Sequence, residues 1–180
     1  MIIRPSTEDD GEALAAIYGH HVLTGFGSFE EVPPTVGEML ARRAKVLELG
    51  LPYLVAEADG RVLGYAYASS YRPRIGYRFT AEDSVYVAQD AIGRGVGRAL
   101  LSGVIKACEL RGLRQIIAVI GDSGNQASIA LHAALGFEPA GVLRNIGFKH
   151  SRWVDSCLMQ LTLNGGETQM PDTPGLALGG

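Results

Sequence analysis

The sequence lacks several features that identify whole classes of protein. It has no apolar run long enough to span a bilayer, and its start, MIIRPSTEDDGE, lacks the basic and apolar segments of a signal peptide. Its formal net charge of −3 provides no overall basic surface for nucleic acid or for an anionic membrane. We therefore expect a cytoplasmic protein that binds neither membrane nor nucleic acid and acts on a small molecule or on another protein.

Cysteine is scarce as well. The two cysteines, Cys108 and Cys157, stand in apolar surroundings and form neither a CxxC pair nor a disulfide framework. We interpret both as reduced residues of the core. No cluster of His, Cys or carboxylate residues has the spacing of a metal site, so we predict no metal.

What the chain does contain is enough apolar residues for one core. The chain is 47% hydrophobic, and its 180 residues are too few to form two domains that each have a core of their own. We predict one domain over residues 1–163. Residues 164–180, NGGETQMPDTPGLALGG, have the Gly, Pro and polar content of a disordered tail.

Helical and strand patterns alternate along the chain and predict an α/β fold. The dipeptide Asp59-Gly60 separates two β-rich runs and predicts an antiparallel hairpin. The expected helices cover residues 7–21, 35–50, 96–111 and 125–135. The expected strands cover residues 1–6, 53–58, 61–69, 82–89, 115–121, 141–148 and 152–163.

The stretch SVYVAQDAIGRGVGRALL runs from a strand through three glycines into a helix. It does not fit a Walker nucleotide loop, which needs a Lys followed by Ser or Thr, and Arg98 occupies the third glycine position of a dinucleotide fingerprint. A purely structural turn stays an alternative. A functional turn would offer uncovered N–H groups at a helix N-terminus to an anion such as a pyrophosphate.

This turn and a later helix, GNQASIALHAALGF, resemble motifs of the GNAT N-acetyltransferase superfamily. With TAEDSVYV and GFKHSRWVDSCLMQL, the resemblance covers about Ile2 to Leu163 and extends to the phosphinothricin and methionine sulfoximine acetyltransferase branch. Ile92 departs from the Gln or Arg frequent at its position, and His132 from the frequent Tyr. The resemblance implies a mixed, largely antiparallel sheet flanked by helices on both faces, and acetyl-CoA as the acetyl donor.

Under this resemblance the turn and the preceding strand bind the cofactor. Arg94 and Arg98 flank the turn and add attraction to a phosphorylated nucleotide, while a strand N–H near Tyr86 or Val87 stabilises the developing oxyanion. The cofactor-binding residues implied are Val85, Tyr86, Val87, Gly93, Arg94, Gly95, Val96, Gly97, Arg98 and Asn125.

Two residues are the implied catalytic pair. An amine must lose a proton before it attacks a thioester, and Glu82 stands where the family places that base. His132 is implied as a second base or as proton donor to the departing thiolate. Without the resemblance, a solvated strand end and a packed helix residue explain them as well.

The acceptor site is predicted from two loops. Arg72, Arg74 and Arg78, with Tyr77, could clamp the oxygens of an amino-acid substrate, although a basic solvated loop explains them too. Phe29 belongs to a segment that the resemblance places over the substrate, although packing alone explains an apolar residue there.

The resemblance also implies a homodimer, and the apolar final strand could bury an edge in it. The predicted function is transfer of acetyl from acetyl-CoA to the α-amino group of a small amino-acid analogue such as phosphinothricin, methionine sulfoximine or methionine sulfone. Two alternatives stay open. One is a protein N-terminal or lysine acetyltransferase, and the other is a non-catalytic acyl-CoA-binding module.

Overall fold

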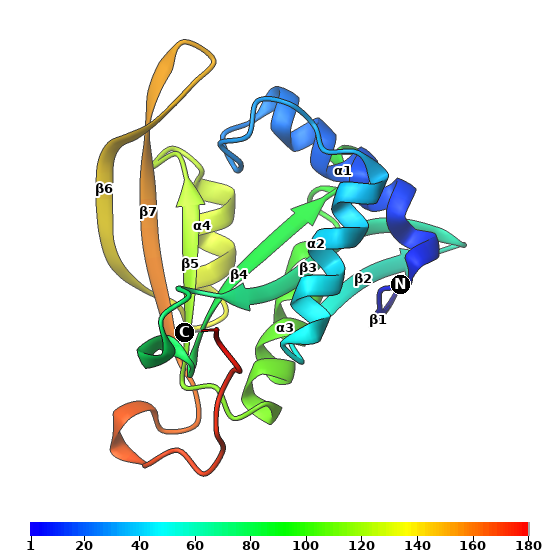
Figure 1. Ribbon diagram of the computed structural model, residues 1–180. Helices are drawn as coiled ribbons and strands as arrows, with labels where there is room; N and C mark the ends of the chain where they lie inside the picture. The colour runs from blue at the N-terminus through cyan, green and yellow to red at the C-terminus, as the bar shows by residue number, and fades with distance from the viewer. Residues whose placement is uncertain (180) are drawn as a thin grey trace.

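The structure is a computed structural model that describes residues 1–179, and its centre is one seven-stranded sheet. The strand order is β1-β2-β3-β4-β5-β7-β6, and every neighbouring pair is antiparallel except β4 and β5 (Figure 1). The strands are β1 (Ile2–Pro5), β2 (Tyr53–Ala58), β3 (Arg61–Ser70), β4 (Thr80–Val87), β5 (Gln115–Gly121), β6 (Glu138–Lys149) and β7 (Arg152–Thr162). The predicted mixed, largely antiparallel sheet is confirmed.

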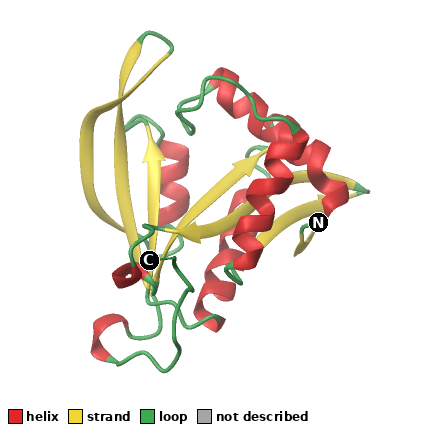
Figure 2. Cartoon of the chain, in the orientation of Figure 1, coloured by secondary structure: helices red, strands yellow, loops and turns green. Residues whose placement is uncertain are grey.

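Four α-helices cover the two faces of this sheet (Figure 2). They are α1 (Gly11–Thr24), α2 (Val36–Glu48), α3 (Val96–Leu110) and α4 (Gln126–Ala133). Tyr18 of α1 packs edge-on against Tyr86 of β4, whereas Gly97 of α3 faces Val85 and Val87 of the same strand. Since successive strand residues point to opposite faces, α1 and α3 lie on opposite sides of β4.

Strands β4 and β5 run side by side only at their start. Their register joins Thr80 to Gln115 and Asp83 to Ala118, and beyond these pairs the two strands separate into a V (Figure 1). The second half of β4 is paired with β3 alone, through register partners that include Tyr86 with Tyr65. The edge of β4 that faces the V therefore keeps backbone groups without a strand partner.

The sequence signals for the local elements act as expected. Asp59 and Gly60 both have positive φ, 52° and 73°, and form the tight turn of the β2–β3 hairpin. The Thr35 side chain accepts a hydrogen bond from the Glu38 N–H, and the Glu38 carboxylate accepts one from the Thr35 N–H. This capping box starts α2 where the sequence predicts it.

The core lies between the sheet and its helices. The apolar stripe of α3 is fully buried and includes Leu100, Leu101, Val104 and Cys108. Burial raises the pKa of the Cys108 thiol to about 12, as expected for a core cysteine. No helix of residues 1–179 is both long enough and apolar enough to cross a membrane.

The C-terminal segment, for which the sequence predicts disorder, has a defined path over residues 164–179. Residues 164–179 extend away from the sheet and then return to it (Figure 1). Leu176, near the end of this path, is only 1% exposed. The Leu176 N–H donates to the Arg78 carbonyl at 2.8 Å, and the Arg111 guanidinium donates to the Gly175 carbonyl. Composition predicts the turns of this segment but not the packing of Leu176 and Leu178 against the core. Residue 180 lies outside the described part of the chain.

Candidate active site

A cavity of about 800 Å³ occupies the V between β4 and β5. It extends from the glycine turn before α3, past β4, to the loop that joins α1 and α2. Most of the residues predicted from sequence line it: Phe29, Glu82, Val85, Tyr86, Val87, Gly93, Gly95, Val96, Gly97, Arg98, Asn125 and His132. One cavity thus holds both the predicted cofactor turn and the predicted base.

The glycine turn is built for close approach of a ligand. Gly93 and Gly95 have φ values of 78° and 77°, which residues with a side chain rarely adopt. A Cβ at either position would meet open space, so nothing of the protein covers the turn there. Gly95 is the N-cap of α3, and the first N–H groups of a helix lack partners within it. The turn therefore fits the negative charge of a pyrophosphate.

The backbone of β4 faces the cavity through alternate residues. The Ala88 N–H donates to the Leu63 carbonyl of the β3 side at 2.9 Å, so by alternation the Tyr86 N–H also points to β3. The N–H groups of Val85 and Val87 point to the V. An oxyanion partner near Tyr86 or Val87 was expected, and this geometry favours Val87, or Val85, over Tyr86.

Asn125 lies at the start of α4, on the cavity wall opposite β4. Its side-chain oxygen caps the helix by accepting from the Ser128 N–H at 3.2 Å. The oxygen is thereby fixed, and the amide NH₂ is the part of Asn125 that can donate to a ligand. This fits the predicted role of Asn125 in binding the cofactor.

Glu82 lies near the point where β4 and β5 separate. Burial raises the pKa of its carboxyl above the usual value, the charge of Asp83 raises it further, and Arg72 opposes this rise. Among residues 1–179 no side chain donates a hydrogen bond to this carboxylate. A carboxylate with a raised pKa and a free lone pair is suited to accept a proton.

His132 is held in a different way. Its Nε2 lies 3.0 Å from Asp83 Oδ2 and its Nδ1 lies 2.7 Å from the Ser128 carbonyl, so both ring nitrogens face acceptors. Burial lowers the pKa of His132, but the bonds and charge of Asp83 and the Ser128 carbonyl outweigh it and leave the pKa raised. Two N–H groups satisfy this geometry, which describes an imidazolium paired with a carboxylate.

Of the two roles expected for His132, this arrangement disfavours the second base, whereas the role of proton donor to the departing thiolate stays a prediction. A base needs a free ring nitrogen, and here neither nitrogen is free. Glu82 and Asp83 are also sequence neighbours, so their side chains point to opposite faces of β4. Glu82 and His132 thus line one cavity from opposite sides of the strand.

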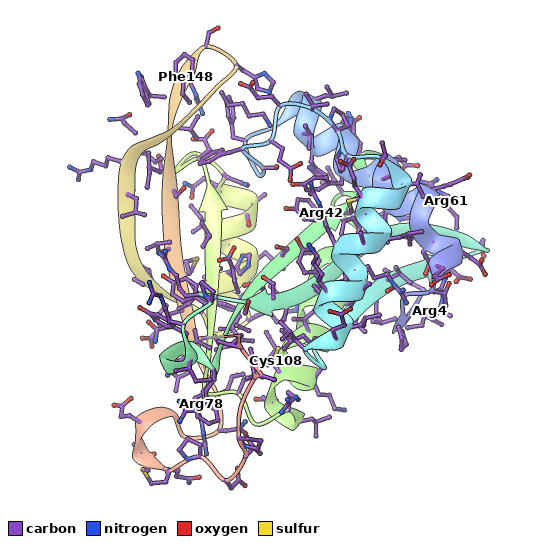
Figure 3. The ribbon with its side chains drawn as sticks, in the orientation of Figure 1. Arg4, Arg42, Arg61, Arg78, Cys108 and Phe148 are labelled. Carbon is purple, nitrogen blue, oxygen red and sulfur yellow. The ribbon has the colours of Figure 1, made fainter. Side chains whose placement is uncertain are left out.

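The predicted arginine clamp lies elsewhere. Arg72, Arg74, Tyr77 and Arg78 do not line the cavity, and Figure 3 shows Arg78 at the opposite end of the molecule from Phe148. Arg72 lies over the Tyr71 ring, and of the clamp residues only Arg72 has a charge that contributes to the pKa of Glu82. Arg94, predicted to bind the cofactor, is also outside the lining, whereas Arg98 is part of it.

Sequence reasoning missed several residues of the lining. His21 of α1 contacts the Val87 carbonyl through Nε2 at 2.9 Å, so this nitrogen carries a proton, and burial lowers the pKa of the ring. Nothing in the helical pattern of α1 singles His21 out. Besides the predicted Phe29, the α1–α2 loop contributes Gly25, Gly27 and Ser28, and its Gly-aromatic composition was the available signal.

Comparisons with known proteins agree with this geometry. Residues 15–137 match the Acetyltransferase (GNAT) family. A phosphinothricin N-acetyltransferase of Alcaligenes faecalis is 62% identical over 94% of this chain and 86% of its own length. An L-methionine sulfoximine/L-methionine sulfone acetyltransferase of Pseudomonas paraeruginosa is 40% identical over 90% of this chain and 94% of its own.

A solved structure is similar as well. The phosphinothricin acetyltransferase of Sinorhizobium meliloti, in complex with AcCoA, has a TM-score of 0.93 and 44% identity. The match covers 98% of this chain and 95% of that one. With the V between β4 and β5 and the open glycine turn before α3, these matches establish that the chain belongs to the GNAT family of N-acetyltransferases.

Proposed function

We propose that this enzyme transfers acetyl from acetyl-CoA to the α-amino group of a small amino-acid analogue, such as phosphinothricin, methionine sulfoximine or methionine sulfone. The observation that supports this most strongly is the position of Glu82. Its carboxylate lies near the point where β4 and β5 separate, in one cavity with the glycine turn. The relatives named for these acceptors match nearly the whole chain.

The chain's own groups have separate roles in this proposal. The α3 N-terminus, Arg98 and the Asn125 amide hold the cofactor, whose thioester supplies the acetyl group. The N–H of Val85 or Val87 polarises the reacting carbonyl. Glu82 accepts the proton of the ammonium, directly or through water, so that the amine can attack. His132 and Asp83 fix α4 against β4 and take no proton from the acceptor.

The acceptor end of the cavity is formed by the α1–α2 loop, where Phe29 offers an apolar ring that is 40% exposed. A small amino acid fits this end better than a peptide, because the loop and the β6–β7 hairpin meet across it. The acceptor clamp predicted from the basic loop stays a prediction, since its residues do not line the cavity of a single chain. These residues are Arg72, Arg74, Tyr77 and Arg78.

The test is thiol release from acetyl-CoA by the purified protein. The panel contains phosphinothricin, methionine sulfoximine, methionine sulfone, ordinary amino acids and a peptide with a free N-terminus. Release with a small α-amino acid and not with the peptide supports the proposal. Release with the peptide alone would favour a protein acetyltransferase, and cofactor binding without release would favour an acyl-CoA-binding module.

We also propose that the enzyme is a homodimer. The β6–β7 hairpin exposes a set of large apolar side chains that water solvates poorly. They are Val142, Leu143, Ile146, Phe148 and Trp153. Light scattering on the eluting protein measures the assembly, and Trp153→Ser is expected to shift a dimer toward monomer. A monomeric wild-type chain at micromolar concentration would refute this proposal.

The cytoplasm is the proposed compartment. Cys108 and Cys157 are both free and buried, which fits a reducing environment. Cell fractionation with an antibody against the native chain would test it.

A further inference from the structure

The first part of the α1–α2 loop, residues 25–31, is anchored to the two helices beside it. The Tyr18 hydroxyl of α1 lies 2.8 Å from Ser28 Oγ and donates to Glu30 at 2.8 Å. The Arg42 guanidinium of α2 donates to both oxygens of Glu30, at 2.7 and 3.1 Å. These bonds fix one side of the loop to the half of the molecule that contains β1 to β4.

The other side of the loop is held by the tip of the β6–β7 hairpin, which curves over the V toward it (Figure 1). Lys149 is 0% exposed, and its Nζ donates to the Ser28 carbonyl at 2.7 Å. The Arg152 guanidinium lies 4.1 Å from the centre of the Phe26 ring. Gly147 lies against Phe29, because a Cβ added at this glycine would clash with the Phe29 ring.

A buried ammonium is costly, and lysine is almost never fully buried without a partner. Burial lowers the pKa of Lys149, and the charges of Glu31 and Glu30 oppose that change. An apolar side chain of the same length would fill the space without this cost. The property that only the lysine supplies is a directed bond to the backbone of the loop.

The bond to Ser28 acts on the loop segment that closes the acceptor end of the cavity. Gly25 to Phe29 all line the cavity, and Ser28 is the one residue bonded both to the α1 side and to the hairpin. Loss of the Lys149 bond would leave Ser28 attached to α1 alone. Phe29, the next residue, would keep its contact with Gly147 but would lose the hydrogen-bonded constraint on the residue before it.

We propose that Lys149 is a positioning residue for the acceptor. By tying Ser28 to the hairpin tip, it holds Phe29 over the acceptor end of the cavity and so determines how tightly a small amine binds. It touches neither acceptor nor cofactor. The inference rests on the proposed transfer to a small amine and adds to it the residue that sets acceptor affinity.

The variant Lys149→Met tests it, since it keeps the side-chain length and removes the charge and the bond. The KM for the acceptor is expected to rise roughly tenfold, with kcat and the KM for acetyl-CoA within about twofold of wild type. Lys106→Met, at an exposed position of α3, is the matched control and should leave all three unchanged. A merely structural role would not separate the two KM values.

Amide hydrogen exchange gives a readout that does not depend on activity. Residues 25–31 should exchange faster in Lys149→Met than in the control, while α3 exchanges at the wild-type rate. If Lys149→Met does not fold, Tyr18→Phe removes the opposite anchor and should also raise the acceptor KM and loop exchange.

The outcomes separate the two proposals. An inactive wild type would refute the proposed acceptors, and the exchange experiment would still decide whether Lys149 fixes the loop. An active wild type with unchanged acceptor KM and unchanged loop exchange in the variant would overturn the role of Lys149. For an unfolded Lys149 variant, an unchanged acceptor KM in Tyr18→Phe would overturn it.

Discussion

The buried pair of Asp83 and His132 provides a sharp test of the site's electrostatics. Their side chains are 2% and 3% exposed, and the second ring nitrogen of His132 is occupied by the Ser128 carbonyl. Asp83→Asn keeps the shape of the side chain and removes its charge. The histidine then loses the group that favours its proton.

The structure sets the size of the effect. Removing one partner of a buried ion pair costs about 3–5 kcal/mol when the other charge stays. Here the amide oxygen of the replacement still accepts one N–H, and His132 can release its proton. The loss should therefore resemble that of one charged hydrogen bond, about 2–3 kcal/mol. This lowers Tm by about 4–12 °C for a chain of this length.

The sign of the pH dependence follows from the raised pKa of His132. A group whose pKa is higher in the folded than in the unfolded protein stabilises the folded state. This stabilisation is complete below the unfolded pKa, 6.5 for histidine, and is lost as the pH rises through the folded pKa. The difference in free energy of unfolding between wild type and Asp83→Asn should be largest at about pH 6 and smaller at about pH 9.

The assay is thermal unfolding followed by circular dichroism, with urea titrations at the same two pH values. Asp172→Asn, at an exposed residue near the C-terminus, is the control and should match wild type throughout. An equal loss at both pH values would refute a charged His132. Wild-type stability in Asp83→Asn would show that the pair contributes nothing.

Three further predictions test the base, the turn and the C-terminal segment. Glu82→Gln should lower kcat roughly 100- to 10,000-fold without changing the Kd for acetyl-CoA. The raised pKa of Glu82 predicts that wild-type activity falls at low pH, and this fall should be absent in the variant. Gly95→Val should weaken acetyl-CoA binding, measured by calorimetry, roughly tenfold or more. Gly60→Val is the control, because Gly60 also has a positive φ of 73° and open space around its Cβ position, and it should leave binding unchanged. Leu176→Ala should cost about 2–5 kcal/mol in urea titrations, and no loss would mean that the segment does not pack.

Much of the fold could be predicted because its signals are local. Alternating apolar residues, the Asp59-Gly60 turn and the stripe of α3 each act within a few residues. The start of α1 is the main local error, since a short 3-10 turn at Glu8–Asp10 precedes the helix. The bond from Arg4 to Asp10 that accompanies this turn crosses from β1 and has no local signature.

The parts of the site that backbone groups form could be predicted from the sequence, whereas the contacts between distant side chains could not. The glycines of the turn indicate its shape, because they allow positive φ values that other residues rarely adopt. The pairing of Asp83 with His132 and the contact of Lys149 with Ser28 join residues 49 and 121 positions apart. Such contacts depend on how the strands and helices pack, which no short window of sequence contains.

The alternation of β4 explains how one strand serves two reactants. Glu82, Ser84 and Tyr86 face α1 and the loop that covers the acceptor, whereas Asp83, Val85 and Val87 face α3 and the glycine turn. A continuous sheet would keep these faces apart. Pairing with β5 ends at Asp83, one residue beyond the proposed base, so the V opens beside Glu82, where the proposed reaction would bring the amine to the thioester. The chemistry therefore depends on where β4 leaves β5 as much as on which residue is the base.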